Sequence, residues 1–158
     1  MLLWTMSLRS SESSPLFRGP IMRDWRGTLV FSLTKQVETN ISVQEEAEAI
    51  NWSTHQIVRC NIAAAVIESD AKVCVEALTK PSSADQWRIS VLSQDTLRVA
   101  NMTKNVSFNW TPRGSNMAAH VLASWSLCNR LFGCFVIGAA ASVFEEVIVS
   151  KQPHLVQV

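Results

Sequence analysis

Two carboxylates, Glu46 and Asp70, stand in the parts of this chain where regular structure is easiest to predict. Glu46 lies near the start of an amphipathic run that predicts a helix over residues 43–60. Asp70 follows the apolar run 63–68, which is typical of a short strand buried on both faces of a sheet. A helix followed by a strand that ends in a carboxylate can bring two acids together, and Mg²⁺ prefers such oxygen ligands. The pattern favours an α/β fold with a candidate cation site at the end of a strand.

Composition narrows the class of protein. The 158 residues are enough for one domain with its own core. Hydrophobic residues make up 47% and charged residues 17% of the chain, which is typical of a globular protein. Because the net charge is only +1, any binding of phosphate must be local or assisted by a metal. The four cysteines form no C-x-x-C pair, which excludes a typical zinc site and predicts free thiols in a reducing compartment.

Hydrophobic periodicity predicts strands and helices in alternation. Ser42 is expected to cap the first helix, with Glu45 completing a capping box. The tryptophans Trp52, Trp87 and Trp125 are expected in the core or at its edge. The other expected elements are a turn over 24–27, a strand over 28–35, a helix over 70–78, a helix over 87–100, a strand over 106–110 with Val106, Phe108 and Trp110 on one face, and a helix over 116–127. This order is an α/β pattern with at least one helical crossover.

Four segments, in their order and spacing, resemble the ribonuclease H-like domain of plant retroelement-type reverse transcriptases. They are residues 22–28 (MRDWRGT), 46–50 (EAEAI), 66–70 (VIESD) and 110–123 (WTPRGSNMAAHVLA). The resemblance implies a ribonuclease H-like mixed sheet flanked by helices over residues 21–127, with 1–20 as a non-matching N-terminal segment and 128–158 as a C-terminal tail. The apolar run 131–144 in that tail is shorter than the roughly 20 residues that cross a membrane, so no membrane partner is expected.

The resemblance also implies a chemistry. The family cuts the RNA strand of RNA–DNA hybrids with four carboxylates and two Mg²⁺ ions about 3.5–4 Å apart. It implies that Glu46 and Asp70 are metal ligands, and that His120 stands where the fourth acid usually lies. Glu46, Asp70 and His120 are therefore the expected catalytic residues, and Arg113 and Asn116 the expected contacts to nucleic acid. Such a protein is expected inside the cell, in the cytoplasm or nucleus.

The first acid of the family has no counterpart in this chain. It belongs to an Asp-Gly-Ala-like motif on a central strand and would fall near residues 8–9, where no carboxylate stands. The domain is therefore expected to be N-terminally truncated and to lack its first catalytic strand, unless residues 1–8 supply a substitute. The expected strand order is 3-2-1-4-5, in which a missing first strand leaves backbone groups of its neighbours unpaired.

Structural roles remain open for the same residues. Glu46 also suits the first turn of a helix, where the macrodipole favours an acid, and Asp70 suits an N-cap. His120 also suits a hydrogen-bonded position on a helix, and Arg113 a solvated loop. Three functions therefore stay open: a hybrid-cleaving ribonuclease, a catalytically impaired remnant that only binds nucleic acid, and an interaction module that uses the apolar tail.

Overall fold

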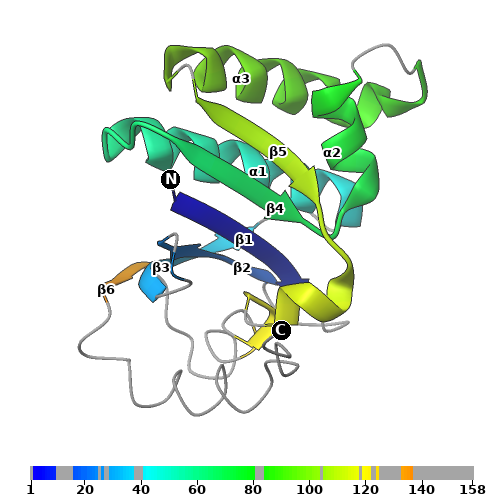
Figure 1. Ribbon diagram of the computed structural model, residues 1–158. Helices are drawn as coiled ribbons and strands as arrows, with labels where there is room; N and C mark the ends of the chain where they lie inside the picture. Colours follow the sequence, from blue (N-terminus) through cyan, green and yellow to red (C-terminus); the bar gives the residue numbers. More distant parts are fainter. Residues whose placement is uncertain are drawn as a thin grey trace, which may run out of the picture.

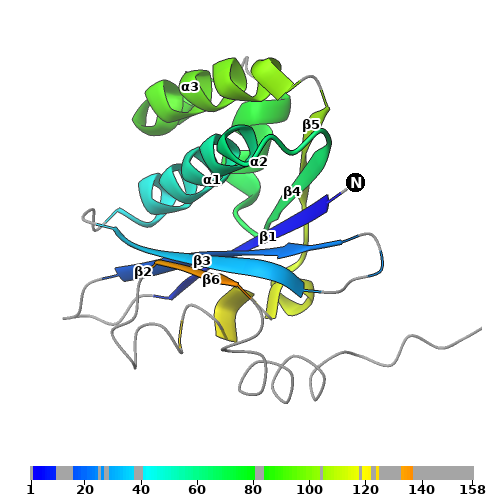
Figure 2. The same ribbon diagram turned by 90° about the vertical axis from the view of Figure 1, so that its left-hand side faces the viewer.

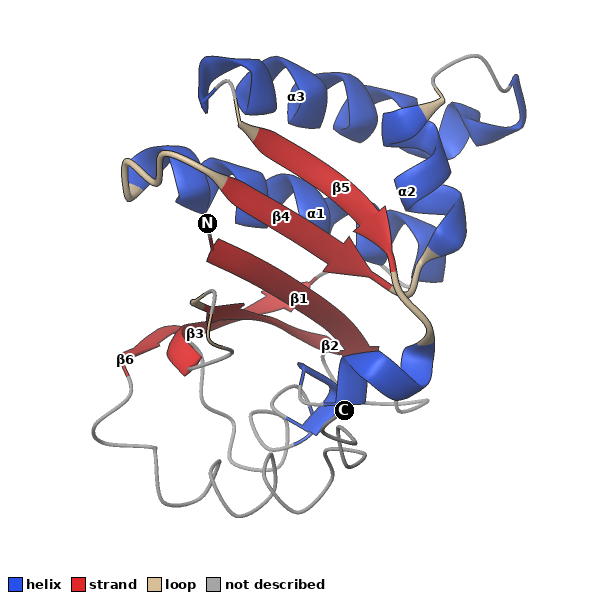
Figure 3. Cartoon of the chain, viewed as in Figure 1, coloured by secondary structure: helices blue, strands red, loops and turns tan. Residues whose placement is uncertain are grey.

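The computed structural model describes residues 2–9, 16–24, 26, 29–37, 41–80, 84–103, 105–117, 119–121, 124 and 133–136. Its strands are β1 (Leu2–Arg9), β2 (Leu16–Arg23), β3 (Leu29–Val37), β4 (Ala65–Ser69), β5 (Val106–Trp110) and β6 (Gly133–Val136). Its α-helices are α1 (Ser42–Arg59), α2 (Lys72–Thr79) and α3 (Ser90–Ala100), and its 3₁₀ turns are η1 (Ala84–Ile89), η2 (Asn101–Thr103) and η3 (Arg113–Asn116) (Figure 3).

The six strands form one mixed sheet in the order β5-β4-β1-β2-β3-β6 (Figure 1). β4 is parallel to both β1 and β5, whereas β1, β2, β3 and β6 pair antiparallel in succession. Parallel neighbours need a crossover, and α1 supplies the one that precedes β4. Apart from β6, this is the order expected from the sequence, and it confirms the α/β class with helices beside a mixed sheet.

β1 lies in the centre of the sheet. It pairs with β2 along most of its length and with β4 from Leu2 to Met6. The expectation that the first strand is lacking is therefore wrong, and the alternative, that the first residues supply a substitute, is confirmed. What β1 lacks is an acid, since its sequence is LLWTMSLR.

The helices α1, α2 and α3 cover one face of the sheet, and the residues of η3 lie beyond the other face (Figure 2). Ile50 and Ile57 of α1 are buried against Ile67 of β4 in the main core. Each fully buried side chain of this size contributes about 1.5–3 kcal/mol to the free energy of unfolding. This packing fixes α1 along β4, and with it the places of the residues at both ends of α1.

Several local expectations need correction. Ser42 is the first residue of α1 and not its N-cap, a position taken by Ile41 without a side-chain cap hydrogen bond. The third helix begins at Ser90, and Trp87 in the preceding turn η1 is 71% exposed instead of packed at the core.

Part of the apolar run 131–144 is β6, which pairs with β3. Within the described residues, no helix is long and apolar enough to cross a membrane.

Candidate nucleic-acid interface

The parallel strands β1, β4 and β5 end at the same edge of the sheet (Figure 1). Ser69, the last residue of β4, is level with Met6 in β1 and with Trp110 in β5. Asp70 follows Ser69 directly, and the Ser69 carbonyl accepts the backbone N–H of Thr111 at 3.0 Å. Ligands of open α/β sheets bind outside the carboxyl ends of such strands. The fold therefore places Asp70 where a ligand site is expected.

Two residues of the segment that follows β5 contact the Asp70 carboxylate. Asn116, which is fully buried, donates from Nδ2 to Asp70 Oδ1 at 2.9 Å. His120 Nε2 lies 3.3 Å from Asp70 Oδ2, and His120 is only 9% exposed. We call Asp70, Asn116 and His120 the Asp70 cluster. Both oxygens of this carboxylate thus face nitrogen atoms of neighbouring side chains.

Glu46 lies near the same edge of the sheet but in the layer of the helices. A short connection joins the end of α1 to the start of β4, so that the N-terminal end of α1 lies toward the carboxyl end of β4 (Figure 1). Cys74 Sγ of α2 contacts the Val43 carbonyl at 3.4 Å, which ties the first turn of α1 to the helix that follows Asp70. Glu46 is 7% exposed, beside Glu45 at 2%. The N-terminal end of α1 therefore carries two buried acids.

The donor set does not fit a pair of Mg²⁺ ions. Among the residues that the structure describes, no three His, Cys, Asp or Glu side chains gather closely enough to hold a metal ion. Ser7 follows Met6 in β1 as Asp70 follows Ser69 in β4, so a serine stands at the register position beside Asp70. His120 supplies no negative charge when neutral, and Mg²⁺ sites are built from oxygen ligands. The structure brings Asp70 and His120 together, and among the described residues Glu46 does not join them in a group of three ligand side chains.

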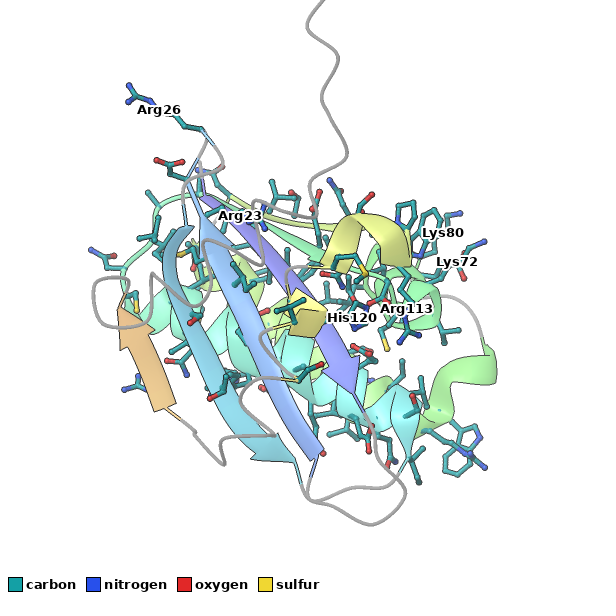
Figure 4. All side chains as sticks on the ribbon, turned by 90° about the horizontal axis from the view of Figure 1, so that it is seen from below. Arg23, Arg26, Lys72, Lys80, Arg113 and His120 are labelled. Carbon is teal, nitrogen blue, oxygen red and sulfur yellow. The ribbon has the colours of Figure 1, made fainter. Side chains whose placement is uncertain are left out.

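The surface beside the Asp70 cluster is basic and aromatic. Trp110 donates from Nε1 to the Asp70 carbonyl at 3.3 Å and is 50% exposed. Lys72 has a 67% exposed side chain, with a long 3.9 Å contact to Glu76, and Arg113 is exposed as well. In Figure 4, Lys72 and Arg113 lie on the same side of the molecule as Lys80 and His120. We call Lys72, Trp110 and Arg113 the strand-end surface.

The site residues predicted from the sequence fall into two groups. Asn116 has no exposed surface and donates to Asp70, so the structure places it inside the Asp70 cluster. Arg113 is exposed and remains a candidate for such a contact. The sequence did not indicate that Trp110 is exposed beside the Asp70 cluster, because its alternation with Val106 and Phe108 predicts a side chain that faces the core. Its position at the end of a strand could have indicated a place beside the site, because Trp110 is the last residue of β5 and lies level with Ser69.

Comparison with known families decides the classification. The sequence profile of the family described as reverse transcriptase-like matches residues 11–126, most of the chain. The chain belongs to this reverse transcriptase-like family. No curated protein matches the chain in sequence.

Three of the solved structures that match this fold are ribonucleases H. The N-terminal RNase H domain of a Mycobacterium tuberculosis protein matches with a TM-score of 0.69 and 15% identity, over 81% of this chain and 94% of that one. RNase H1 from Halobacterium salinarum gives 0.69 and 14%, over 81% and 96%. LC11-RNase H1 in complex with an RNA/DNA hybrid gives 0.71 and 11%, over 82% and 99%. At these identities the similarity establishes the ribonuclease H fold of this member of the reverse transcriptase-like family.

Proposed function

We propose that this chain is a ribonuclease H-type domain that binds RNA–DNA hybrids at the strand-end surface. The observation that carries the proposal is the exposure of Lys72 and Arg113 where the parallel strands of a ribonuclease H fold end. Local cations of this kind hold phosphate groups although the net charge is only +1. LC11-RNase H1, a protein with the same fold, was solved in complex with such a hybrid, which supports the choice of ligand.

We propose further that the chain binds the hybrid without cutting it by the two-metal route. Metal-dependent cleavage needs clustered carboxylates that hold both ions. Here Ser7 follows the last residue of β1 that pairs with β4, as Asp70 follows the end of β4, and Asn116 and His120 face the two oxygens of Asp70. The resemblance of residues 110–123 to plant retroelement proteins supports an origin in such an element, with the nucleus or cytoplasm as the place of action.

Binding is tested with a fluorescently labelled RNA–DNA hybrid and a chelator that removes divalent cations. We expect the double variant Lys72→Gln with Arg113→Gln to bind about tenfold more weakly, and the slope of log affinity against log salt to fall by about 2, because two phosphate contacts are lost. Arg59→Gln is the matched control, since Arg59 is exposed at the opposite end of α1. Equal weakening by the control variant would contradict the assignment of the surface.

Cleavage is tested with the same hybrid in Mg²⁺ and in Mn²⁺. We expect the wild-type protein to leave the RNA strand as intact as Asp70→Asn and Glu46→Gln variants do. Cleavage by the wild type that needs the metal and disappears in both variants would show that the ribonuclease function is retained. Binding without cleavage would leave the hybrid-binding proposal standing.

A further inference from the structure

Trp110 has an unusual setting for a tryptophan at the end of a strand. The alternate residues Val106 and Phe108 pack against the core, whereas Trp110 is 50% exposed. Its Nε1 donates to the Asp70 carbonyl at 3.3 Å, so that one edge of the indole is held against the end of β4. A large apolar ring gains free energy by burial. An indole that is anchored and yet half exposed at a ligand-binding edge is therefore suited to cover apolar surface of a ligand.

The neighbours of Trp110 specify the chemistry of that ligand. Lys72 and Arg113 are exposed cations on the two segments that leave the ends of β4 and β5. Aromatic rings among cations are the arrangement by which proteins bind single-stranded nucleic acids, since the cations follow the phosphates and the ring stacks on a base. A base inside a duplex is stacked on both faces, so a protein ring stacks on a base that has left the duplex.

We infer that Trp110 stacks on an unpaired nucleobase, so that the strand-end surface prefers a hybrid with a single-stranded extension to a fully paired one. This inference rests on the proposed function, because it concerns the ligand of the same surface. It assigns different tasks to neighbouring residues: Lys72 and Arg113 hold the backbone, and Trp110 selects the unpaired base. The stack requires no particular base, because every base has an apolar face.

Trp87 provides a matched control within the chain. It is 71% exposed, more than Trp110, but it lies in η1 and the guanidinium of Arg88 stands over its ring at 5.3 Å from the centroid. The cation therefore occupies one face of the Trp87 ring. Replacement of Trp87 removes an exposed tryptophan without changing the end of β5.

The experiment compares a blunt RNA–DNA hybrid, the same hybrid with a single-stranded overhang, and the single strand alone, all in chelator. We expect the wild-type protein to bind the overhang hybrid about tenfold more tightly than the blunt one. Trp110→Ala should abolish this preference, Trp110→Phe should keep most of it, and Trp87→Ala should leave it unchanged. Quenching of tryptophan emission by the overhang should disappear in Trp110→Phe. Urea unfolding of each variant shows that the variant is folded.

The outcomes separate the two proposals. Tight but equal binding of the blunt and overhang hybrids overturns the role of Trp110 and leaves the hybrid-binding function intact. A preference that survives in folded Trp110→Ala also overturns the inference. Failure of all three nucleic acids to bind overturns the proposed function, and this inference with it.

Discussion

Two aspartates of this molecule, Asp95 and Asp70, each have an asparagine and a histidine as neighbours, but their side chains differ in exposure to solvent. Asp95 on α3 accepts a hydrogen bond from Asn51 Nδ2 at 2.8 Å, and His55 Nε2 lies 2.9 Å from the same oxygen. Arg98 Nη2 lies 2.6 Å from the other oxygen. The Asp95 side chain is 34% exposed, whereas that of Asp70 is 14% exposed. The same residue types thus surround a solvated carboxylate in one place and a nearly buried one in the other.

This difference in exposure shows that the position of each aspartate in the fold decides which elements it joins and how much its contacts stabilise them. Asp95 joins α3 to α1 on the surface of the helical layer, where water can replace a lost partner at little cost. Asp70 joins the end of β4 to Asn116 and His120, which follow β5 in the chain. The Asp70 cluster therefore holds Arg113 and its neighbours next to the end of the sheet, and shapes the strand-end surface.

The largest effect on stability is expected at Asn116, the fully buried member of the Asp70 cluster. Asn116→Ala removes a hydrogen bond to a carboxylate and leaves space at a fully buried position, so the free energy of unfolding should fall by about 2 kcal/mol. Urea unfolding measures this loss. Asn51→Ala at Asp95 is the matched control and should cost less, because Asp95 is more exposed. A larger loss in Asn51→Ala than in Asn116→Ala would reverse the ranking of the two clusters.

Hydrophobic periodicity in the sequence predicted the bounds of β5 and α1 well. The strand 106–110 has the bounds of β5, and the helix predicted over 43–60 is α1 within one residue at each end. Both have a clear hydrophobic period, and packing of the periodic face decides the element. β6 was missed, since a four-residue strand at the edge of a sheet gains its hydrogen bonds from β3, far away in the sequence.

The candidate site was predictable only in part. The position of Asp70 at the end of a buried strand followed from the sequence, because an apolar run that ends in an acid is a local signal. Its partner Asn116 lies 46 residues away, and no pattern in the chain indicates that the amide turns inward to the carboxylate. The exposure of Trp110 was not predicted, because alternation places it on the same face as Val106 and Phe108, whereas this last residue of the strand is 50% exposed.

A smaller effect, and one that depends on pH, is expected at Asp95. Hydrogen bonds from Asn51, then from His55 and Arg98, hold the pKa of Asp95 well below its ordinary value of 3.8. Because the folded-state pKa is the lower one, the charged carboxylate stabilises the fold above the ordinary pKa, and this contribution is lost as the pH falls toward the folded pKa. The difference in unfolding free energy between wild type and Asp95→Asn should therefore be constant above about pH 5 and shrink below about pH 4. A difference that grows on acidification would contradict the sign of the shift.

The smallest effects on stability are expected at two exposed arginines, Arg98 and Arg113, which differ in what they contact. Arg98 contacts the carboxylate of Asp95 and has a 68% exposed side chain, so Arg98→Gln should lower stability slightly in low salt and not at all near 1 M salt, where charges are screened within about 3 Å. Arg113→Gln should leave stability unchanged at both salt concentrations but weaken binding of the hybrid, whereas Arg98→Gln should leave that binding unchanged. Thermal unfolding of both variants at both salt concentrations, and hybrid titration of both variants, measure these effects. A loss of hybrid binding in Arg98→Gln equal to that in Arg113→Gln would mean that the ligand is attracted by overall charge, and that the end of the parallel strands does not select it.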